Sequence, residues 1–179
     1  MKFLRNSCAR CSAAVSKTSL VAFTIIAIVP QIAAAQVVIS EFMFDAPGSD
    51  SKSEWVELQN TGTDSIDISK WKINDGSNHV YNAPPKNGST GSLIIDSGAF
   101  LILAADAGTF IGAHPEVSTS VIDTVIDLPN LGGKIMLLDA SSTKVDSVSY
   151  TTSKGADGTG ESLQKVNGKL VAAKPTPGA

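Results

Sequence analysis

Two short segments in which apolar and polar residues alternate constrain the fold of this chain more than any other feature. In the first, Val56 and Leu58 alternate with Glu57 and Gln59. The second, residues 66–73, alternates in the same way, and a turn of Thr, Gly and Asp separates the two. Because successive side chains of a strand point to opposite faces, this pattern predicts two β-strands, each with one buried face and one face in water.

The rest of the chain from residue 36 onward shows the same period of two. Clusters of Gly, Asp, Asn, Ser and Pro separate the strand-like segments, and no stretch of a dozen residues has helical periodicity. About nine short strands predict an all-β, two-sheet sandwich in a single domain. We expect residues 135–138 in a buried central strand. Residues 79–81 run into Pro84 and Pro85, which lack backbone donors, so we expect this segment either to lie at a sheet edge or to leave the sheet. Residues 109–120 are predicted to form a long loop with a short helical turn.

The first 35 residues have the composition of an export signal rather than of a sandwich. Four basic residues and no acidic residue accompany an apolar stretch at residues 20–29, which Pro30 ends, and Ala33 to Ala35 match a signal-peptidase site. We therefore expect cleavage after Ala35 and a mature domain of residues 36–179 that is secreted or extracytoplasmic, in the periplasm or at the cell surface. Retention of the segment as an anchor is the alternative, although its apolar stretch is shorter than the roughly 20 residues of a membrane span.

The charge of residues 36–179 argues against one large class of partners. These 144 residues contain all 17 acidic residues and ten lysines, which gives a net charge of −7, and they contain neither arginine nor cysteine. Affinity for nucleic acid depends on basic side chains that neutralise phosphates, so nucleic acid is not expected as a partner. Because the domain has no disulfide, its core must supply its stability.

Short motifs follow one another along residues 36–179. In chain order they are residues 38–43 (VISEFM), 54–60 (EWVELQN), 67–71 (DISKW), 81–86 (YNAPPK), 104–108 (AADAG), 128–139, 160–165 (GESLQK) and 175–179 (PTPGA). Together these motifs resemble the lamin-tail domain (LTD) family, in its bacterial secreted type. The resemblance implies an immunoglobulin-like sandwich that serves as an interaction module. Chromatin binding is not carried over from lamins, because this domain has little basic charge.

Two groups of acidic residues are candidates for a cation site. Glu41, Glu54 and Glu57 lie on strands expected to be neighbours, and clustered carboxylates can hold a divalent cation. The second group consists of the loop residues Asp45, Asp50, Asp75 and Asp157. Neither group has the spacing of an EF-hand loop. Both are interpreted as solvated, turn-forming or hydrogen-bonded side chains, and no metal or cofactor is assigned.

The histidines and tryptophans are further candidates for a functional site. His79 and His114 could serve a nucleophile triad or a zinc site, but the chain has no Gly-x-Ser-x-Gly motif and no third ligand at the usual spacing. No catalytic residue is assigned. The glycosylation acceptor motif at residues 87–89 is interpreted as an exposed hairpin tip. Alternation places Trp71 in the core and leaves Trp55 as a surface residue.

These features predict a secreted or cell-envelope protein that is not an enzyme and acts as an interaction or adhesion module for a protein or glycan. Residues 45–53 and 109–120 are the predicted binding loops. The alternative is a small extracytoplasmic, metal-dependent hydrolase. It would use the glutamate cluster with a metal, or one histidine as a base.

Overall fold

The computed structural model describes residues 36–48 and 51–179. The predicted export signal, residues 1–35, lies outside the described residues, and so does Asp50. Within the described ranges, no helix is long and apolar enough to cross a membrane.

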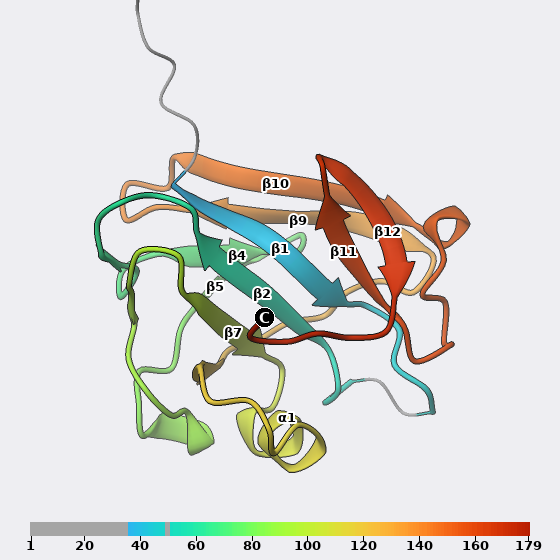
Figure 1. Ribbon diagram of the computed structural model, residues 1–179, viewed down its shortest axis with the longest axis horizontal. Helices are drawn as coiled ribbons and strands as arrows, with labels where there is room; N and C mark the ends of the chain where they lie inside the picture. The colour runs from blue at the N-terminus through green and yellow to red at the C-terminus, as the bar shows by residue number, and fades with distance from the viewer. Residues whose placement is uncertain (1–35, 49–50) are drawn as a thin grey trace, which may run out of the picture. The chain divides into compact units, whose positions relative to one another are not determined.

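The described chain is built around two β-sheets that pack face to face (Figure 1). The larger sheet has six strands in the order β12-β11-β1-β2-β7-β8, and the smaller has four in the order β10-β9-β4-β5. A third, two-stranded sheet joins β3 to β6. All neighbouring strands are antiparallel except β7 and β8, which are parallel. The architecture confirms the predicted all-β sandwich.

The six-stranded sheet contains β1 (Val37–Met43), β2 (Trp55–Asn60), β7 (Phe100–Ala104), β8 (Ser120–Asp123), β11 (Ser162–Val166) and β12 (Lys169–Ala173). The four-stranded sheet contains β4 (Lys72–Asn74), β5 (Asn78–Val80), β9 (Gly132–Leu138) and β10 (Lys144–Thr151). The other elements are β3 (Ile66–Asp67), β6 (Ile94–Ile95), helix α1 (Ala107–Ala113) and the short 3-10 turns η1 (Lys86–Gly88) and η2 (Thr152–Lys154).

The described residues form twelve strands rather than the nine expected. The segment 66–73, expected as one strand, is divided into β3 and β4, which belong to different sheets because a turn at residues 69–70 separates them. Helix α1 confirms the predicted helical turn, and β9 confirms the predicted central strand, since it lies between β10 and β4. Strand β5 lies at a sheet edge, as predicted for this segment.

A β-bulge in β1 decides which of its side chains face the other sheet. Ile39 pairs with Leu58 but Glu41 pairs with Glu57, so β1 has one more residue than β2 between these pairs. Ile39 and Phe42 both belong to the core between the sheets. In a regular strand, residues three apart would point to opposite faces. The bulge therefore turns Glu41 to the outer face of the sheet, opposite Glu57.

The main core fills the space between the two sheets. Three of its rings, Phe42, Phe44 and Tyr150, pack with centroids 4.7 to 6.5 Å apart. Ile135 and Leu137 of β9 are fully buried against them in the same cluster. Burial of side chains of this size stabilises a fold by about 1.5 to 3 kcal/mol each, so this core can hold the domain without a disulfide.

The outer face of the six-stranded sheet is also covered, which corrects the expectation that one face of β2 lies in water. Trp55 and Glu57 are each only 1% exposed. A second apolar cluster joins Trp55 and Ile102 of the sheet to Phe110 of α1. Residues 174–179 cross the same face beside it (Figure 1). Alternation along one strand does not reveal such a cover, because the cover comes from distant parts of the chain.

A buried carboxylate at the end of β8 holds the loop that precedes β6. The side-chain amides of Asn82 and Asn87 donate to Asp123 Oδ1 at 2.6 and 3.0 Å, and the Asp123 N–H donates to Ser89 Oγ at 2.8 Å. Ser89 is only 3% exposed. The interpretation of residues 87–89 as an exposed hairpin tip is correct for the exposure of Asn87 and Gly88, but Ser89 is buried and the segment is the 3-10 turn η1 rather than a hairpin.

The substitution Asp123→Asn tests this contact. It replaces a charged acceptor with a neutral amide whose NH2 group cannot accept a hydrogen bond. We expect the free energy of unfolding to fall by about 1 to 3 kcal/mol, measured by urea denaturation. The control is Asp127→Asn in the nearby exposed segment, which should change stability by less than about 0.5 kcal/mol. Equal losses in the two variants would contradict the role given to Asp123.

Candidate functional site

Two cross-strand residue pairs lie next to each other on the covered outer face of the sheet. Met43 of β1 pairs with Trp55 of β2, and Glu41 pairs with Glu57. Both pairs point to the same face because their positions on each strand are two residues apart. The first pair lines a pocket, and the second holds residues 174–179.

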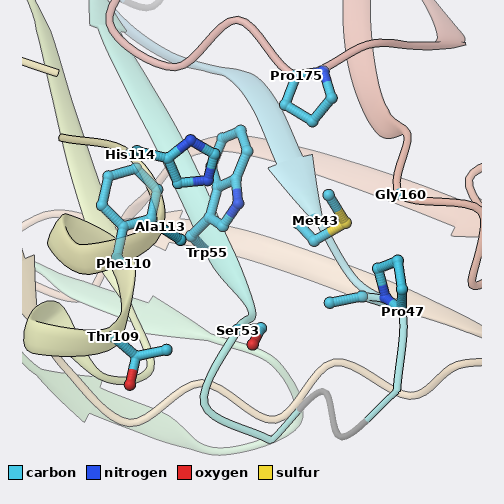
Figure 2. Close-up of a pocket in the computed structure, with 11 residues that line it drawn as sticks. Met43, Pro47, Ser53, Trp55, Thr109, Phe110, Ala113, His114, Gly160 and Pro175 are labelled. Atoms are coloured by element: carbon cyan, nitrogen blue, oxygen red, sulfur yellow. The ribbon is translucent and has the colours of Figure 1, made fainter. Parts of the chain in front are cut away.

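The pocket, here called the Trp55 pocket, has a volume of about 260 Å³ (Figure 2). Met43 and Trp55 line it from the sheet, Phe110 lines it from α1, and His114 lines it from the position directly after α1. Figure 2 shows the α1 side chains on one side of Trp55, with Met43 on the other. Pro175 lines the pocket from the last residues of the chain. The space is thus bounded by apolar and aromatic groups from three separate segments.

Contacts among three rings hold the aromatic side of the pocket in place. The ring of Phe110 lies 5.7 Å from that of Trp55 at an interplanar angle of 73°. The same ring lies 4.6 Å from that of His114, which in turn lies 6.3 Å from Trp55. Such edge-to-face and tilted contacts are favourable geometries for aromatic pairs. Asp106 caps α1 by accepting the Thr109 N–H at 2.8 Å, which fixes the start of the helix that carries Phe110 and is followed by His114.

Trp55 is more buried than expected, and Trp71 is less buried than expected. Trp55, expected at the surface, is 1% exposed, whereas Trp71, expected in the core, is half-buried and packs at the margin of the main core. Trp55 is buried because α1 covers the outer face of β2. Trp71 lies in the turn before β4, where it is only partly enclosed.

The predicted binding loops meet at the Trp55 pocket. Residues 45–53 contribute Ala46, Pro47 and Ser53 to its lining. Residues 109–120 contribute Phe110 of α1 and His114, which directly follows the helix. The two predicted loops therefore lie at one pocket, and Trp55, expected at the surface, is buried between them.

Glu41 is buried and accepts hydrogen bonds from two segments. Its Oε1 accepts the Thr176 N–H at 3.0 Å, and its Oε2 accepts from Thr176 Oγ1 at 2.9 Å. The hydroxyl of Ser162 in β11 also donates to Oε1. One carboxylate therefore ties β1 to β11 and to the last residues of the chain.

Glu57 has fewer partners and a perturbed pKa. Its Oε2 accepts the Gly178 N–H at 2.6 Å, and its Oε1 accepts from Ser40 Oγ at 2.6 Å. Burial raises the pKa of Glu57 from 4.5 to about 7, and the neighbouring charge of Glu41 adds to this rise. The hydrogen bonds from Ser40 and Gly178 lower the pKa and oppose burial without cancelling it. The side chain therefore carries a proton in mildly acidic solution.

The third glutamate of the predicted cluster lies apart from these two. Glu54 precedes β2, and its carboxylate accepts the Leu128 N–H at 3.1 and 3.2 Å. It is 3% exposed. The structure thus brings Glu41 and Glu57 together and gives Glu54 a separate role in anchoring the segment after β8.

The loop aspartates and the histidines are dispersed. Asp75 accepts the Asp127 N–H at 2.9 Å and lies 3.0 Å from His79 Nε2, whereas His114 belongs to the Trp55 pocket. Asp45 accepts from the side-chain amide of Asn130 at 3.1 Å, and Asp157 is exposed in a loop. Among the described residues, no group of three or more His, Cys, Asp or Glu side chains is arranged to hold a metal ion.

The substitution Glu57→Gln tests the protonation of Glu57. The folded protein holds this proton up to about pH 7, whereas the pKa of an unperturbed glutamate is 4.5. The stability that the proton contributes is therefore complete below about pH 4.5 and is lost as the pH rises through 7. In denaturant unfolding of the unsubstituted protein, the free energy of unfolding should fall by about 1 to 3 kcal/mol as the pH rises over this range. In Glu57→Gln this fall should be absent, because the neutral amide resembles the protonated acid.

Glu41→Gln is the matched control for this experiment. Thr176 and Ser162 present three donors to the Glu41 carboxylate, and an amide NH2 group must face at least one of them. We expect Glu41→Gln to lower the free energy of unfolding by about 1 to 3 kcal/mol in both acidic and alkaline solution. A Glu57→Gln protein that keeps the pH profile of the unsubstituted protein would contradict the protonation of Glu57.

Comparison with protein families agrees with this fold. The family model of the Lamin Tail Domain matches residues 30–152. The matched segment contains β1 to β10, α1 and both binding loops, and it ends before β11, β12 and residues 174–179. A search of curated proteins found no match. Because the family model matches more than half of the chain, this protein belongs to the lamin tail domain family, whose fold is an immunoglobulin-like β-sandwich.

Proposed function

We propose that this protein is a non-catalytic interaction module, secreted or held at the cell envelope, that binds a protein or glycan partner through the Trp55 pocket. The observation that carries the proposal is the meeting of residues 45–53 and 109–120 at one aromatic pocket. Loops on a rigid β-sandwich are common positions for binding residues. The lamin tail domain family, to which the chain belongs, supports a module of this kind rather than an enzyme.

The shape of the pocket favours a protein partner over a glycan. Trp55 is 1% exposed, so it cannot offer the open ring face on which a sugar would stack. A pocket of about 260 Å³ lined by Met43, Trp55, Phe110 and Pro175 has the size and chemistry to take one apolar side chain. Buried anchor residues of this type contribute much of the affinity at protein interfaces. The partner that fits best is therefore a protein that inserts a single aromatic or branched aliphatic side chain.

The proposed location rests on residues 1–35. Their basic start, apolar stretch and Ala33 to Ala35 site are typical of a cleaved export signal. The lack of cysteine in residues 36–179 is compatible with an oxidising compartment, because no thiol can form an unwanted disulfide there.

A pocket-filling substitution tests the proposed binding site. Ala113 lines the Trp55 pocket at the end of α1 and is exposed, so Ala113→Trp should fill the space without disturbing the core. The control is Ala140→Trp, at an exposed turn between β9 and β10. Partners captured from the cell envelope of the native host would be purified and titrated against all three proteins. We expect Ala113→Trp to bind at least about tenfold more weakly, equal to about 1.4 kcal/mol, and Ala140→Trp to bind normally.

Equal binding by Ala113→Trp and the unsubstituted protein would place the interface elsewhere. Treatment of the captured material with protease or with periodate separates the two partner classes. Loss of binding after protease alone is the result expected for a protein partner, whereas loss after periodate alone would indicate a glycan.

The N-terminus of the protein recovered from its native host tests the proposed export. Mass spectrometry should find a chain that begins at Gln36 in the extracytoplasmic fraction, because the predicted cleavage follows Ala35. A chain that retains residues 1–35 and stays in the cytoplasm would contradict the proposed location.

A further inference from the structure

The last described residues, 174–179, run from β12 across the outer face of the six-stranded sheet to β2 (Figure 1). We propose that these residues form a strap that closes one wall of the Trp55 pocket and that opens as the solution becomes alkaline. The strap is a property of the fold and is tested without any partner. Only its consequence for binding rests on the function proposed above.

Hydrogen bonds to two buried carboxylates hold the strap closed. Thr176 donates its N–H and its hydroxyl to Glu41 at 3.0 and 2.9 Å, and Gly178 donates its N–H to Glu57 at 2.6 Å. The side-chain amide of Gln164 in β11 donates to Thr176 Oγ1 at 3.2 Å. The strap therefore pairs with side chains instead of adding a strand to the sheet, and its closure depends on Glu41 and Glu57.

The charges around Glu57 disfavour a second negative charge beneath the strap. Glu41 faces it from β1, and Ala179 of the strap lines the same hollow. Lys165 of β11 also lines the hollow, but its ammonium group pairs with Asp146 at 3.2 Å. Strand β7 contributes no titratable side chain. Lys174 of the strap is exposed to solvent. Ionisation of Glu57 therefore takes place beside the Glu41 carboxylate, whose charge raises the pKa of Glu57.

Opening of the strap and loss of this proton are thermodynamically linked. With the strap closed the pKa of Glu57 is about 7, and exposure to water moves it toward 4.5. An opening that releases a proton becomes more favourable as the pH rises between these values. A shift of this size sets a ceiling of about 300-fold on the increase in the opening equilibrium. Because neighbouring strands also bury Glu57, we expect an increase of at least about tenfold between pH 5 and pH 8.

The strap contributes to the Trp55 pocket through Pro175. Pro175 lines the pocket and directly precedes Thr176, the residue bonded to Glu41. On the sheet, Glu57 and Trp55 lie two residues apart on the same face. A side chain that occupies the pocket therefore contacts the closed strap, so occupancy and closure favour each other. The affinity of the pocket should fall as the pH rises.

Hydrogen exchange of the full chain without a partner tests the strap. The amides of Thr176 and Gly178 report its opening, and their rates are corrected for base catalysis of exchange. We expect the corrected opening constants to rise at least about tenfold from pH 5 to pH 8, and to be independent of pH in Glu57→Gln. The amide of Leu128, which also donates to a buried glutamate but lies outside the strap, is the control and should not follow this profile.

Quenching of Trp55 fluorescence provides a second measurement. The chain has two tryptophans, so Trp71→Phe leaves Trp55 as the only emitter. Acrylamide quenching should increase with pH in this background and should stay low when Glu57→Gln is added. Gly178→Pro, which removes the N–H donated to Glu57, should give high quenching at every pH. Opening constants that do not change with pH, or an equal pH dependence in Glu57→Gln, would overturn the proposal.

The two proposals can fail separately. A strap that responds to pH in a protein whose Ala113→Trp variant binds its partner normally would leave the strap in place and overturn the pocket as the binding site. A pocket that binds the partner with the same affinity at pH 5 and pH 8, in a protein whose strap amides do not respond to pH, would overturn the strap alone.

Discussion

The bulge in β1 is the constraint on which the rest of the arrangement depends. One inserted residue lets Ile39 and Phe42 face the same core, although they are three positions apart. It also turns Glu41 outward, where hydrogen-bond donors reach it. In a regular strand with Ile39 in the core, the ring of Phe42 would point outward and the carboxylate of Glu41 would point into the core. A carboxylate buried without hydrogen-bond partners is strongly destabilising. The apolar core and the polar anchor of the outer face therefore come from the same irregularity.

Much of the fold could be predicted from the sequence because period-two alternation is a local signal. It indicated most of the strands, while the prolines after β5 indicated its edge position and the uninterrupted apolar run of residues 135–138 indicated the central position of β9. Alternation could not indicate that β2 is buried on both faces, since the cover is supplied by α1 and by residues 174–179, more than 40 and 110 residues further along the chain. Trp55 is buried, against the prediction, for this reason. One sequence feature does indicate a sheet buried on both faces. Phe42, Met43 and Phe44 are three consecutive apolar residues, whereas a strand with one face in water alternates apolar and polar residues.

The candidate site was predictable only in part, because composition identifies loops but does not show which distant segments cover a side chain. Loops 45–53 and 109–120 are recognisable as loops from their composition, and they do meet at one pocket. The glutamates were grouped because their strands were expected to be neighbours, which holds for Glu41 and Glu57 but not for Glu54. No sequence pattern shows that an acidic side chain is buried beneath another segment. The burial that raises the pKa of Glu57 is thus a tertiary effect, and it is visible only once the last residues of the chain are in place.

The position of β1 in its sheet has a consequence for how the protein acquires its structure. The first strand of the domain lies between β2, which follows it closely, and β11, which is formed more than 120 residues later. During synthesis β1 can pair on one side at once, but its other edge stays unpaired until almost the whole chain is available. Pairings between such distant segments slow folding and expose strand edges meanwhile. A chain shortened before β11 would keep most of its core residues and still present an open, aggregation-prone edge at the centre of its largest sheet.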